Sequence, residues 1–281
     1  MNIALETTLI THGLPRPHNV ATAFLLEETA RQLGCQPRTI AVLDGKVRVG
    51  LTHDEILALA EREDVIKAGV RELPLAIAQR KSASTTVSAT TRIAAEQGIP
   101  VFATGGIGGV HPGPWDVSQD ILELSRSPVV VVCAGPKAIL DLQATHEMLE
   151  SFGVTVVGYQ TDTAPAFYTR STHLPVPRVE SPEEIAAVYC AGRDLNLPGG
   201  VLVYNPIPAE YEIAAGEIQG WRDLAMADLH QAGVSGKAIT PFLLDRMAEY
   251  SGGRTVTANV QLVKNNVVLG CHIALALRGR L

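Results

Sequence analysis

Short apolar runs alternate with segments of helical spacing along the whole chain. The valine run at 129–132 is apolar on both faces, which is typical of a central, fully buried strand. Residues 19–33 instead space their apolar side chains three and four apart and keep Glu27 and Glu28 outward, which predicts an amphipathic helix. No linker, low-complexity tract or internal repeat divides the chain. The pattern predicts one α/β domain over residues 1–281, with a sheet between helices.

Turn and capping signals add further elements to this pattern. Asp44-Gly45 predicts a hairpin turn, and Thr52 with Glu55 predicts a capping box at the start of a helix. The predicted strands lie at 3–5, 40–43, 47–50, 65–68, 100–104, 154–158 and 200–204. The predicted helices begin after residues 52, 87 and 135, begin after the N-caps Ser181 and Thr240, and span residues 210–232 and 255–278.

Composition and charge exclude several classes of protein. The net charge is -6 and there is no basic stripe, so nucleic-acid binding is not expected. The longest apolar run is far too short for a membrane span. Cys35, Cys133, Cys190 and Cys271 form no C-x-x-C pair, which is typical of buried thiols in a reducing compartment. Without a signal peptide before the first strand, we expect a cytoplasmic protein.

Lys137 lies where the buried strand at 129–132 gives way to a helix that Pro136 is expected to open. In open α/β sheets, ligands bind at the carboxyl ends of strands. A lysine there is partly desolvated and close to a helix N-terminus, and both features disfavour its ammonium form. A neutral amine is what Schiff-base chemistry with a carbonyl substrate requires. The alternative is a surface lysine on a first helical turn.

Three other stretches carry candidate chemistry. Glu6 directly follows the strand at 3–5, and it is either a general acid or base or a capping carboxylate. Lys67 lies in an apolar segment, and it is either a ligand for an anion or a lysine at the edge of a strand. The hydroxyl-rich residues 82–87 precede a helix, where backbone N–H groups and the helix dipole favour a phosphate, although such residues are also ordinary N-caps.

A glycine-rich loop, residues 105–109, follows the strand at 100–104. It does not complete the dinucleotide pattern G-x-G-x-x-G, because His111 stands in place of the third glycine, so a Rossmann-type dehydrogenase is only a minor alternative. Its glycines still predict a close approach of the backbone to another group. After this loop, Asp116, Ser118 and Asp120 could supply oxygen ligands to a hard cation such as Mn²⁺ or Mg²⁺. The alternative is that the acids lie at a helix N-terminus, where the helix dipole favours negative charge.

These motifs resemble the pseudouridine-5′-phosphate glycosidases, the indigoidine synthase A-like family. The resemblance covers nearly the whole chain in order, at 4–13, 103–111, 132–137, 205–208, 240–244 and 259–266. It implies a three-layer α/β/α sandwich, a homotrimer and an enzyme acting on a small molecule. The implied reaction is the reversible cleavage of the C–C glycosidic bond of pseudouridine 5′-phosphate by water, which yields uracil and ribose 5-phosphate.

The resemblance also assigns roles to residues. A C–C bond has no heteroatom leaving group, and the family holds ring-opened ribose 5-phosphate as a Schiff base, which supplies an electron sink. Lys137 matches the Schiff-base lysine, Glu6 the proton donor, and Asp116 the ligand of Mn²⁺, the family's metal. The residues that match substrate contacts are Lys67, which is expected on the phosphate, Thr86, Val87, His111, Ser118, Gln119, Asp120 and Asn259.

The chain departs from the family's pattern after the glycine-rich loop. The family has an arginine after the histidine and a longer spacer before the metal aspartate, whereas here Pro112 follows His111 and Trp115 precedes Asp116. Trp115 suits stacking on a flat aromatic aglycone, or it braces the shortened loop. One alternative function is therefore a C-glycosynthase that attaches ribose 5-phosphate to an aromatic natural product. A more remote alternative is a non-catalytic sugar-phosphate binding protein, against which the joint presence of the lysines and acids argues.

Overall fold

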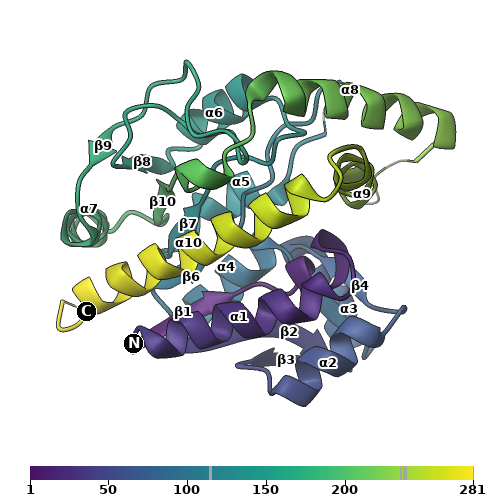
Figure 1. Cartoon of the computed structure of the whole chain (residues 1–281). Helices are drawn as coiled ribbons and strands as arrows, with labels where there is room; N and C mark the ends of the chain where they lie inside the picture. Colours follow the sequence, from purple (N-terminus) through teal and green to yellow (C-terminus); the bar gives the residue numbers. More distant parts are fainter. Residues whose placement is uncertain (114–115, 235, 237–238, 281) are drawn as a thin grey trace.

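The structure is a computed structural model that describes residues 1–113, 116–234, 236 and 239–280. A ten-stranded sheet has the order β4-β5-β2-β1-β6-β7-β10-β8-β9, with β3 paired to β2 (Figure 1). The pairs β2–β3 and β2–β5 are antiparallel, and the other pairs are parallel. The strands are β1 (Asn2–Leu5), β2 (Gln36–Leu43), β3 (Lys46–Val49), β4 (Ile66–Ala68), β5 (Ala83–Thr85), β6 (Val101–Ala103), β7 (Val130–Cys133), β8 (Thr155–Tyr159), β9 (Arg178–Val179) and β10 (Val201–Tyr204).

Helices cover both faces of this sheet. They are α1 (His18–Gln32), α2 (His53–Glu61), α3 (Leu73–Ala78), α4 (Val87–Glu96), α5 (Gln119–Leu124), α6 (Leu142–Ser151), α7 (Pro182–Asp194), α8 (Ala215–Ala232), α9 (Ile239–Tyr250) and α10 (Arg254–Ala276). A π-helical turn, η1 (Leu9–Gly13), and the 3₁₀ turns η2 (Val70–Glu72) and η3 (Ala209–Tyr211) join them.

The pleat of the central strands separates two hydrophobic cores. Ile3 and Leu5 of β1 pack into the core beneath α1, α7 and α10, whereas Ala4 between them packs into the core beneath α3, α4 and α6. In Figure 1, α10 and α1 run side by side across one face of the sheet. Because strands buried on both faces need helices on both sides, the sequence predicts three layers, and the structure confirms this α/β/α sandwich.

Several local predictions are confirmed. Asp44 and Gly45 both have positive φ, 48° and 78°, and they connect β2 to its antiparallel partner β3. At the start of α2, Glu55 N donates to Thr52 Oγ1 at 3.2 Å and Thr52 N donates to Glu55 Oε2 at 2.8 Å, which completes the capping box. Ser181 caps α7 through a single hydrogen bond, in which Glu184 N donates to Ser181 Oγ at 3.2 Å.

The prediction that a helix begins at Pro136 is wrong. Residues 136–140 form a turn instead, in which Lys137 N donates to Ile107 O at 3.1 Å and Leu140 N donates to Lys137 O at 3.0 Å. Helix α6 begins only at Leu142, where the Asp141 side chain accepts from Ala144 N. The backbone after β7 therefore pairs with the glycine-rich loop before it can turn into a helix.

The starts of two later helices also differ from the predictions. α8 begins at Ala215 rather than at residue 210, because the preceding backbone is extended and Ile213 N donates to Tyr168 O at 3.0 Å. α9 begins at Ile239, so Thr240 lies inside its first turn and is not its cap. The predicted end of α8 and the long final helix α10 are confirmed.

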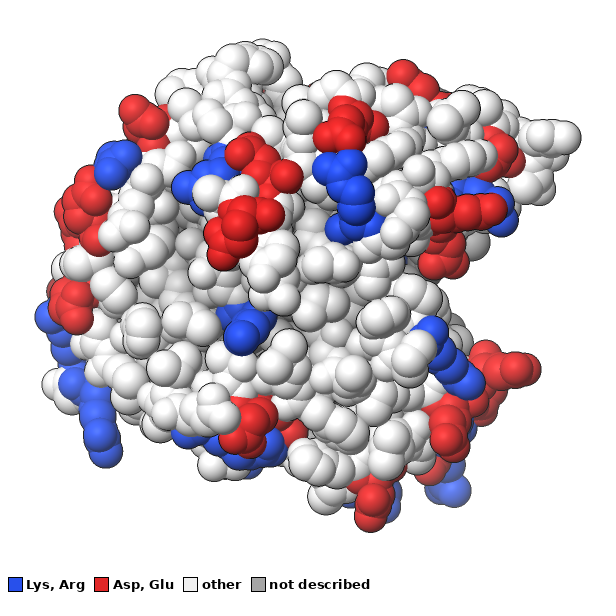
Figure 2. Space-filling view, viewed as in Figure 1, with Lys and Arg blue, Asp and Glu red and all other residues white. Residues whose placement is uncertain are grey.

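Charged side chains are mixed over the surface. On the face in Figure 2, Lys and Arg are interspersed with Asp and Glu rather than gathered into one basic area. The Arg62 guanidinium, for example, contacts Asp44 at 3.1 Å and Asp64 at 2.8 Å. Within the described ranges, no helix combines the length and the apolar character of a membrane span.

Candidate active site

Two adjoining cavities open at the carboxyl ends of the central strands, the edge at which open α/β sheets bind ligands. We call them the inner cavity, of about 40 Å³, and the outer cavity, of about 420 Å³. They are direct neighbours, because Thr8, Lys67, Lys137 and Thr240 line both. Ten of the eleven site residues expected from the sequence line one cavity or both, and Val87 lines neither.

Glu6 and Lys137 enter the inner cavity from the ends of nearby strands. Glu6 is the first residue after β1, and its carboxylate accepts hydrogen bonds from Thr8 Oγ1 and Thr104 Oγ1. Lys137 lies in the turn after β7, so the helix N-terminus expected beside its amine is absent. An amine and a carboxylate share this small space, as imine chemistry with proton transfer requires.

Asn259 brings an unpaired acceptor to the inner cavity. It projects from α10, is only 4% exposed, and its Oδ1 has no hydrogen-bond partner among the described residues. A buried acceptor without a partner costs about 1–3 kcal/mol. A bound molecule that offers an N–H or O–H group would remove this cost.

The other asparagines of α10 support strand ends instead of lining a cavity. Asn266 Nδ2 donates to Thr104 O at 2.8 Å, and its Oδ1 accepts from Asn205 Nδ2 at 3.0 Å. Asn265 Nδ2 donates to Pro206 O at 3.2 Å. These bonds join the ends of β6 and β10 to the helix and hold the edge of the sheet from which the cavities open.

Two half-buried histidines are held neutral beside the lysines. Burial and the nearby charge of Lys67 lower the pKa of His12, which lines the inner cavity. Burial likewise lowers the pKa of His111 in the outer cavity, where the Asp116 charge opposes the shift and Lys67 and Lys137 add to it. Neutral imidazoles can donate or accept a hydrogen bond without adding a further positive charge.

The start of α4 faces the outer cavity. Thr86 and Ser88 line it, and their hydroxyls lie 3.0 Å apart. The Val87 side chain is buried in the core, but Val87 is the first residue of α4, so its N–H is one of those without a partner inside the helix. A contact from Val87 to a ligand would therefore come from its backbone, at a position that favours a phosphate.

The segment 118–120 is tied to its surroundings by its polar groups. Asp120 is 4% exposed, and its two oxygens accept from Ser88 N and Gly108 N, both at 2.8 Å. Ser118 Oγ caps α5 by accepting from Asp120 N, and Gln119 Oε1 accepts from Arg71 N at 2.8 Å. These residues hold the outer wall of the cavity together.

Asp116 is the exposed acid of the outer cavity. Its backbone oxygen accepts from His111 N at 2.9 Å, which places the two residues together. No group of three His, Cys, Asp or Glu side chains with metal-ligand spacing occurs among the described residues. The donor set fits a hard cation that takes most of its ligands from water and a substrate phosphate, as Mg²⁺ and Mn²⁺ do.

The glycine-rich loop approaches the protein's own side chains. A Cβ on Gly106 would lie 2.5 Å from the Phe167 ring, and one on Gly108 would lie 2.3 Å from Ser118 Oγ. Phe167 has a positive φ of 62°, is 2% exposed and lines the inner cavity. The backbone that a dinucleotide would need is therefore already covered, which argues against the dehydrogenase alternative.

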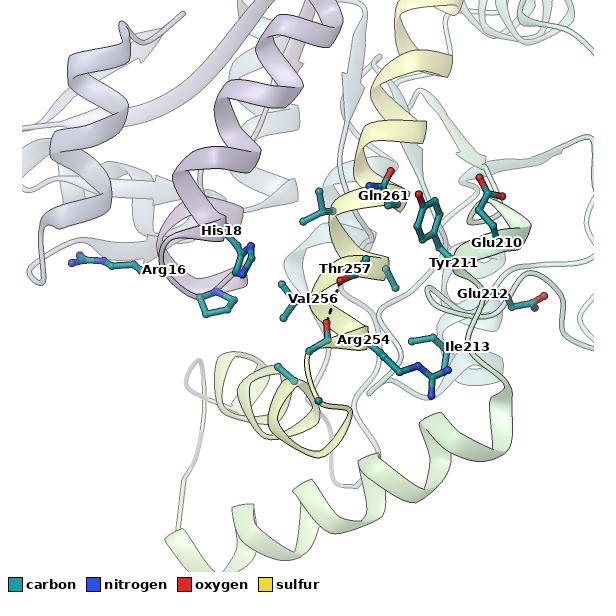
Figure 3. A pocket seen from close by; sticks show the side chains of 16 residues that line it. Arg16, His18, Glu210, Tyr211, Glu212, Ile213, Arg254, Val256, Thr257 and Gln261 are labelled. Atoms are coloured by element: carbon teal, nitrogen blue, oxygen red, sulfur yellow. Dashed lines mark hydrogen bonds between the residues drawn. The ribbon is translucent and has the colours of Figure 1, made fainter.

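A larger groove lies away from these cavities, between the start of α1, the turn η3 and the start of α10 (Figure 3). Its volume is about 820 Å³. Arg254 in this groove pairs with Glu217 at 2.5 Å and stacks over the Trp221 ring at 5.4 Å. We therefore place the candidate active site in the smaller cavities, where an acid, two lysines and an unpaired acceptor meet.

Comparisons with known proteins identify the family of this chain. A family model described as "Indigoidine synthase A like protein" matches residues 2–276. The chain belongs to the indigoidine synthase A-like family. It is 54% identical to the pseudouridine-5′-phosphate glycosidase of Pseudothermotoga lettingae over 96% of both chains. It is 51% identical to that of Fervidobacterium nodosum over 98% of this chain and 93% of the relative. The resemblance expected from the motifs is confirmed.

Two solved structures of similar proteins share the fold. An indigoidine synthase A-like protein from Thermotoga maritima superposes with a TM-score of 0.94 at 42% identity, over 99% of this chain and 93% of that one. The prealnumycin C-glycosynthase AlnA, solved in complex with ribulose 5-phosphate, superposes with a TM-score of 0.89 at 35% identity, over 98% and 91%. Members of this fold family therefore include both a C-glycosynthase and proteins named as glycosidases.

Four residues of this site have no sequence signal of their own. Thr8, His12 and Thr104 lie inside the motifs at 4–13 and 103–111, and each of them lines a cavity or contacts Glu6. The signal of Phe167 is its positive φ, which only a structure provides. Trp115, the basis of the aromatic-aglycone alternative, lies outside the described residues.

Proposed function

We propose that this protein is a pseudouridine-5′-phosphate glycosidase that cleaves the C–C bond between ribose 5-phosphate and uracil. The observation that carries the proposal is the meeting of Lys137, Glu6 and the unpaired Asn259 Oδ1 in the inner cavity, next to a roomier outer cavity. The names of relatives about half identical over nearly the whole chain support it.

The geometry suits a mechanism through Lys137. Its Nζ forms a bond to the sugar C1′ as the C1′–O4′ bond opens, and the ring oxygen takes a proton. The nitrogen lone pair then expels the base carbon, which takes a proton from Glu6, and an iminium remains on Lys137. Water hydrolyses this iminium, which releases ribose 5-phosphate in its open form, restores the Lys137 amine and returns a proton to the Glu6 carboxylate.

The outer cavity is proposed to hold the phosphate. Lys67 lines both cavities, and the start of α4 with Thr86 and Ser88 forms one wall of the outer one. A lysine charge and the backbone N–H of Val87, the first residue of α4, are two features that stabilise a phosphate dianion. Substrate would thus lie with its phosphate outward and C1′ at Lys137.

Asn259 favours uracil over an aromatic aglycone without polar hydrogens. A carboxamide complements the adjacent C=O and N–H groups of a pyrimidine, which would give Asn259 Oδ1 its missing donor. A hydrocarbon-like acceptor would leave that oxygen unpaired at a cost of about 1–3 kcal/mol. The C-glycosynthase alternative is supported by the likeness to AlnA, and it requires an acceptor that offers such a donor.

A divalent cation, Mn²⁺ by resemblance, is proposed at Asp116 with His111 nearby. Bound there, the ion would neutralise negative charge on the phosphorylated substrate. Asp116→Asn should weaken Mn²⁺ binding at least about tenfold, as measured by the electron paramagnetic resonance signal of unbound Mn²⁺. Equal Mn²⁺ affinity of the variant and the native protein would contradict the assignment.

The homotrimer and the cytoplasmic location expected from the sequence are proposals as well. Light scattering on the purified protein should give three times the chain mass of 29.9 kDa. A mass of one or two chains would contradict the trimer. The cysteines Cys35, Cys133, Cys190 and Cys271 carry free thiols, which is compatible with a reducing compartment.

The test of the function is uracil release. The protein with Mn²⁺ and pseudouridine 5′-phosphate should produce uracil and ribose 5-phosphate in equal amounts by liquid chromatography. No uracil, together with a Lys137 adduct of ribose 5-phosphate, would favour the C-glycosynthase alternative. No uracil and no adduct would favour the binding-protein alternative.

A further inference from the structure

The Glu6 carboxylate is held by hydroxyl groups from two directions. Thr104 Oγ1 donates to Glu6 Oε1, and Thr8 Oγ1 donates to Glu6 Oε2. Both threonines are buried, at 1% and 7% exposure. The sheet register explains the first contact: Leu5 of β1 pairs with Ala103 of β6, so the next residue of each strand, Glu6 and Thr104, are neighbours.

The backbone of Thr104 is itself fixed from two sides. Its N–H donates to Val132 O at 3.0 Å, and its carbonyl accepts from Asn266 Nδ2 at 2.8 Å. Asn266 is fully buried and is held in turn by Asn205. A continuous set of hydrogen bonds therefore runs from α10 and the end of β10 to the carboxylate.

Such a clamp has a chemical use in this reaction. Proton delivery to a carbon atom requires the donor oxygen within hydrogen-bond reach of that carbon, and a misplacement of about 1 Å costs on the order of 100-fold in rate. A glutamate side chain alone rotates about three bonds. One hydroxyl on each oxygen fixes both the position and the plane of the carboxylate.

We propose that Thr104, together with Thr8, is a positioning residue that holds the Glu6 carboxylate for proton transfer to the base carbon. The inference rests on the proposed function and adds a residue to which that function assigns no role. Thr104 acts on the C–C bond step alone, because formation of the Lys137 imine from ribose 5-phosphate and its trapping do not require proton transfer to a base.

The test compares Thr104→Val, which keeps the side-chain shape and removes the hydroxyl, with Thr104→Ser, which restores it. For Thr104→Val we expect kcat for uracil release to fall about 10- to 100-fold with KM within about twofold. The rate of borohydride-trapped adduct formation with ribose 5-phosphate should stay within about twofold of the native rate. Thr104→Ser should recover most of kcat. Thr8→Val, tested separately, should lower kcat for uracil release and leave the rate of adduct formation near the native rate.

Thr91→Val is the matched control, because Thr91 Oγ1 is buried and has no hydrogen-bond partner in the described part of the chain. Native kcat in Thr104→Val, or equal losses in uracil release and adduct formation, would overturn the positioning role. If the native protein forms the adduct and releases no uracil, both the proposed function and the positioning role of Thr104 are overturned. Failure of the function is therefore seen in the native protein alone, whereas failure of the positioning role is seen only when Thr104→Val is compared with it.

Discussion

The inner and outer cavities differ from the groove of Figure 3 in the groups they gather. The groove has a volume of about 820 Å³ and the outer cavity about 420 Å³. In the groove, Arg254 is satisfied by Glu217 and by the face of Trp221. In the inner cavity, Lys67 and Lys137 line the same space as Glu6, and Asn259 Oδ1 has no hydrogen-bond donor among the described residues.

This difference has a physical cause. A buried acceptor without a hydrogen-bond partner costs free energy in the empty protein, and a ligand that offers an N–H group removes that cost. The two lysines that line the same cavity suit a ligand that also carries negative charge. Convergent chemistry that a ligand would complete, and not volume, therefore distinguishes the candidate site from the groove.

Removing the Lys137 amine should have the largest effect. Lys137→Ala should lower uracil release at least about 10³-fold, because no other group in the account supplies the electron sink. Binding of ribose 5-phosphate by calorimetry should weaken only modestly, since Lys67 and the start of α4 remain. Lys46→Ala, on an exposed strand, is the matched control for loss of a lysine. Normal turnover in Lys137→Ala would refute the mechanism.

Next in size is the support beneath the cavities. Asn266→Leu leaves Thr104 O and Asn205 Nδ2 without their partners in a fully buried place, so the free energy of unfolding should fall by roughly 2–4 kcal/mol. Asn265→Ala, one residue along, removes a single bond from a half-buried side chain and should cost about 1 kcal/mol. Urea unfolding measures both, and equal losses would contradict the role of Asn266.

Acid should destabilise the protein through its half-buried histidines. Burial is the largest cause that lowers the pKa of His12, His111 and His146 below 6.5 in the folded chain. The unfolded chain therefore binds protons more readily than the folded one. The contribution of these neutral histidines to stability is complete above pH 6.5, and it is lost as the pH falls from there through their lower pKa values in the folded chain. The melting temperature should drop between about pH 7.5 and pH 5.5. In His12→Gln that drop should be smaller; an unchanged drop would contradict the burial argument.

The smallest effect is expected in the groove. Arg254→Ala removes an exposed ion pair and leaves the cavities untouched, so kcat/KM for uracil release should stay within about twofold. The same assay on Lys67→Ala should show a much larger rise in KM. If Arg254→Ala impaired turnover as strongly as Lys67→Ala, the separation between groove and site would fail.

Much of the fold follows from the sequence, because buried strands and capping boxes are local signals. The valine run predicted β7, and Thr52 with Glu55 predicted the start of α2. The helix expected at Pro136 failed because its backbone bonds to Ile107, a partner thirty positions away in the chain that local pattern does not contain. The late start of α8 has the same cause, through Tyr168.

The site was predictable in its residue types more than in its geometry. Motifs identified Glu6, Lys67 and Lys137, and the structure places all three in the inner cavity. The spacing of the acids did not show that the oxygens of Asp120 are taken by backbone N–H groups, whereas Asp116 is exposed. The resemblance named Asn259 and not Asn266 as a substrate contact, but only packing decides that the Asn259 oxygen is left unpaired while that of Asn266 accepts from Asn205.

The most direct test of the account is to trap the imine. The protein would be incubated with ribose 5-phosphate and Mn²⁺, reduced with borohydride, and analysed by intact mass and peptide mapping, with and without uracil. A mechanism through Lys137 predicts one reduced adduct on that lysine, which disappears when uracil is added first, with formation of pseudouridine 5′-phosphate. No adduct, or an adduct on another lysine such as Lys67, would contradict it.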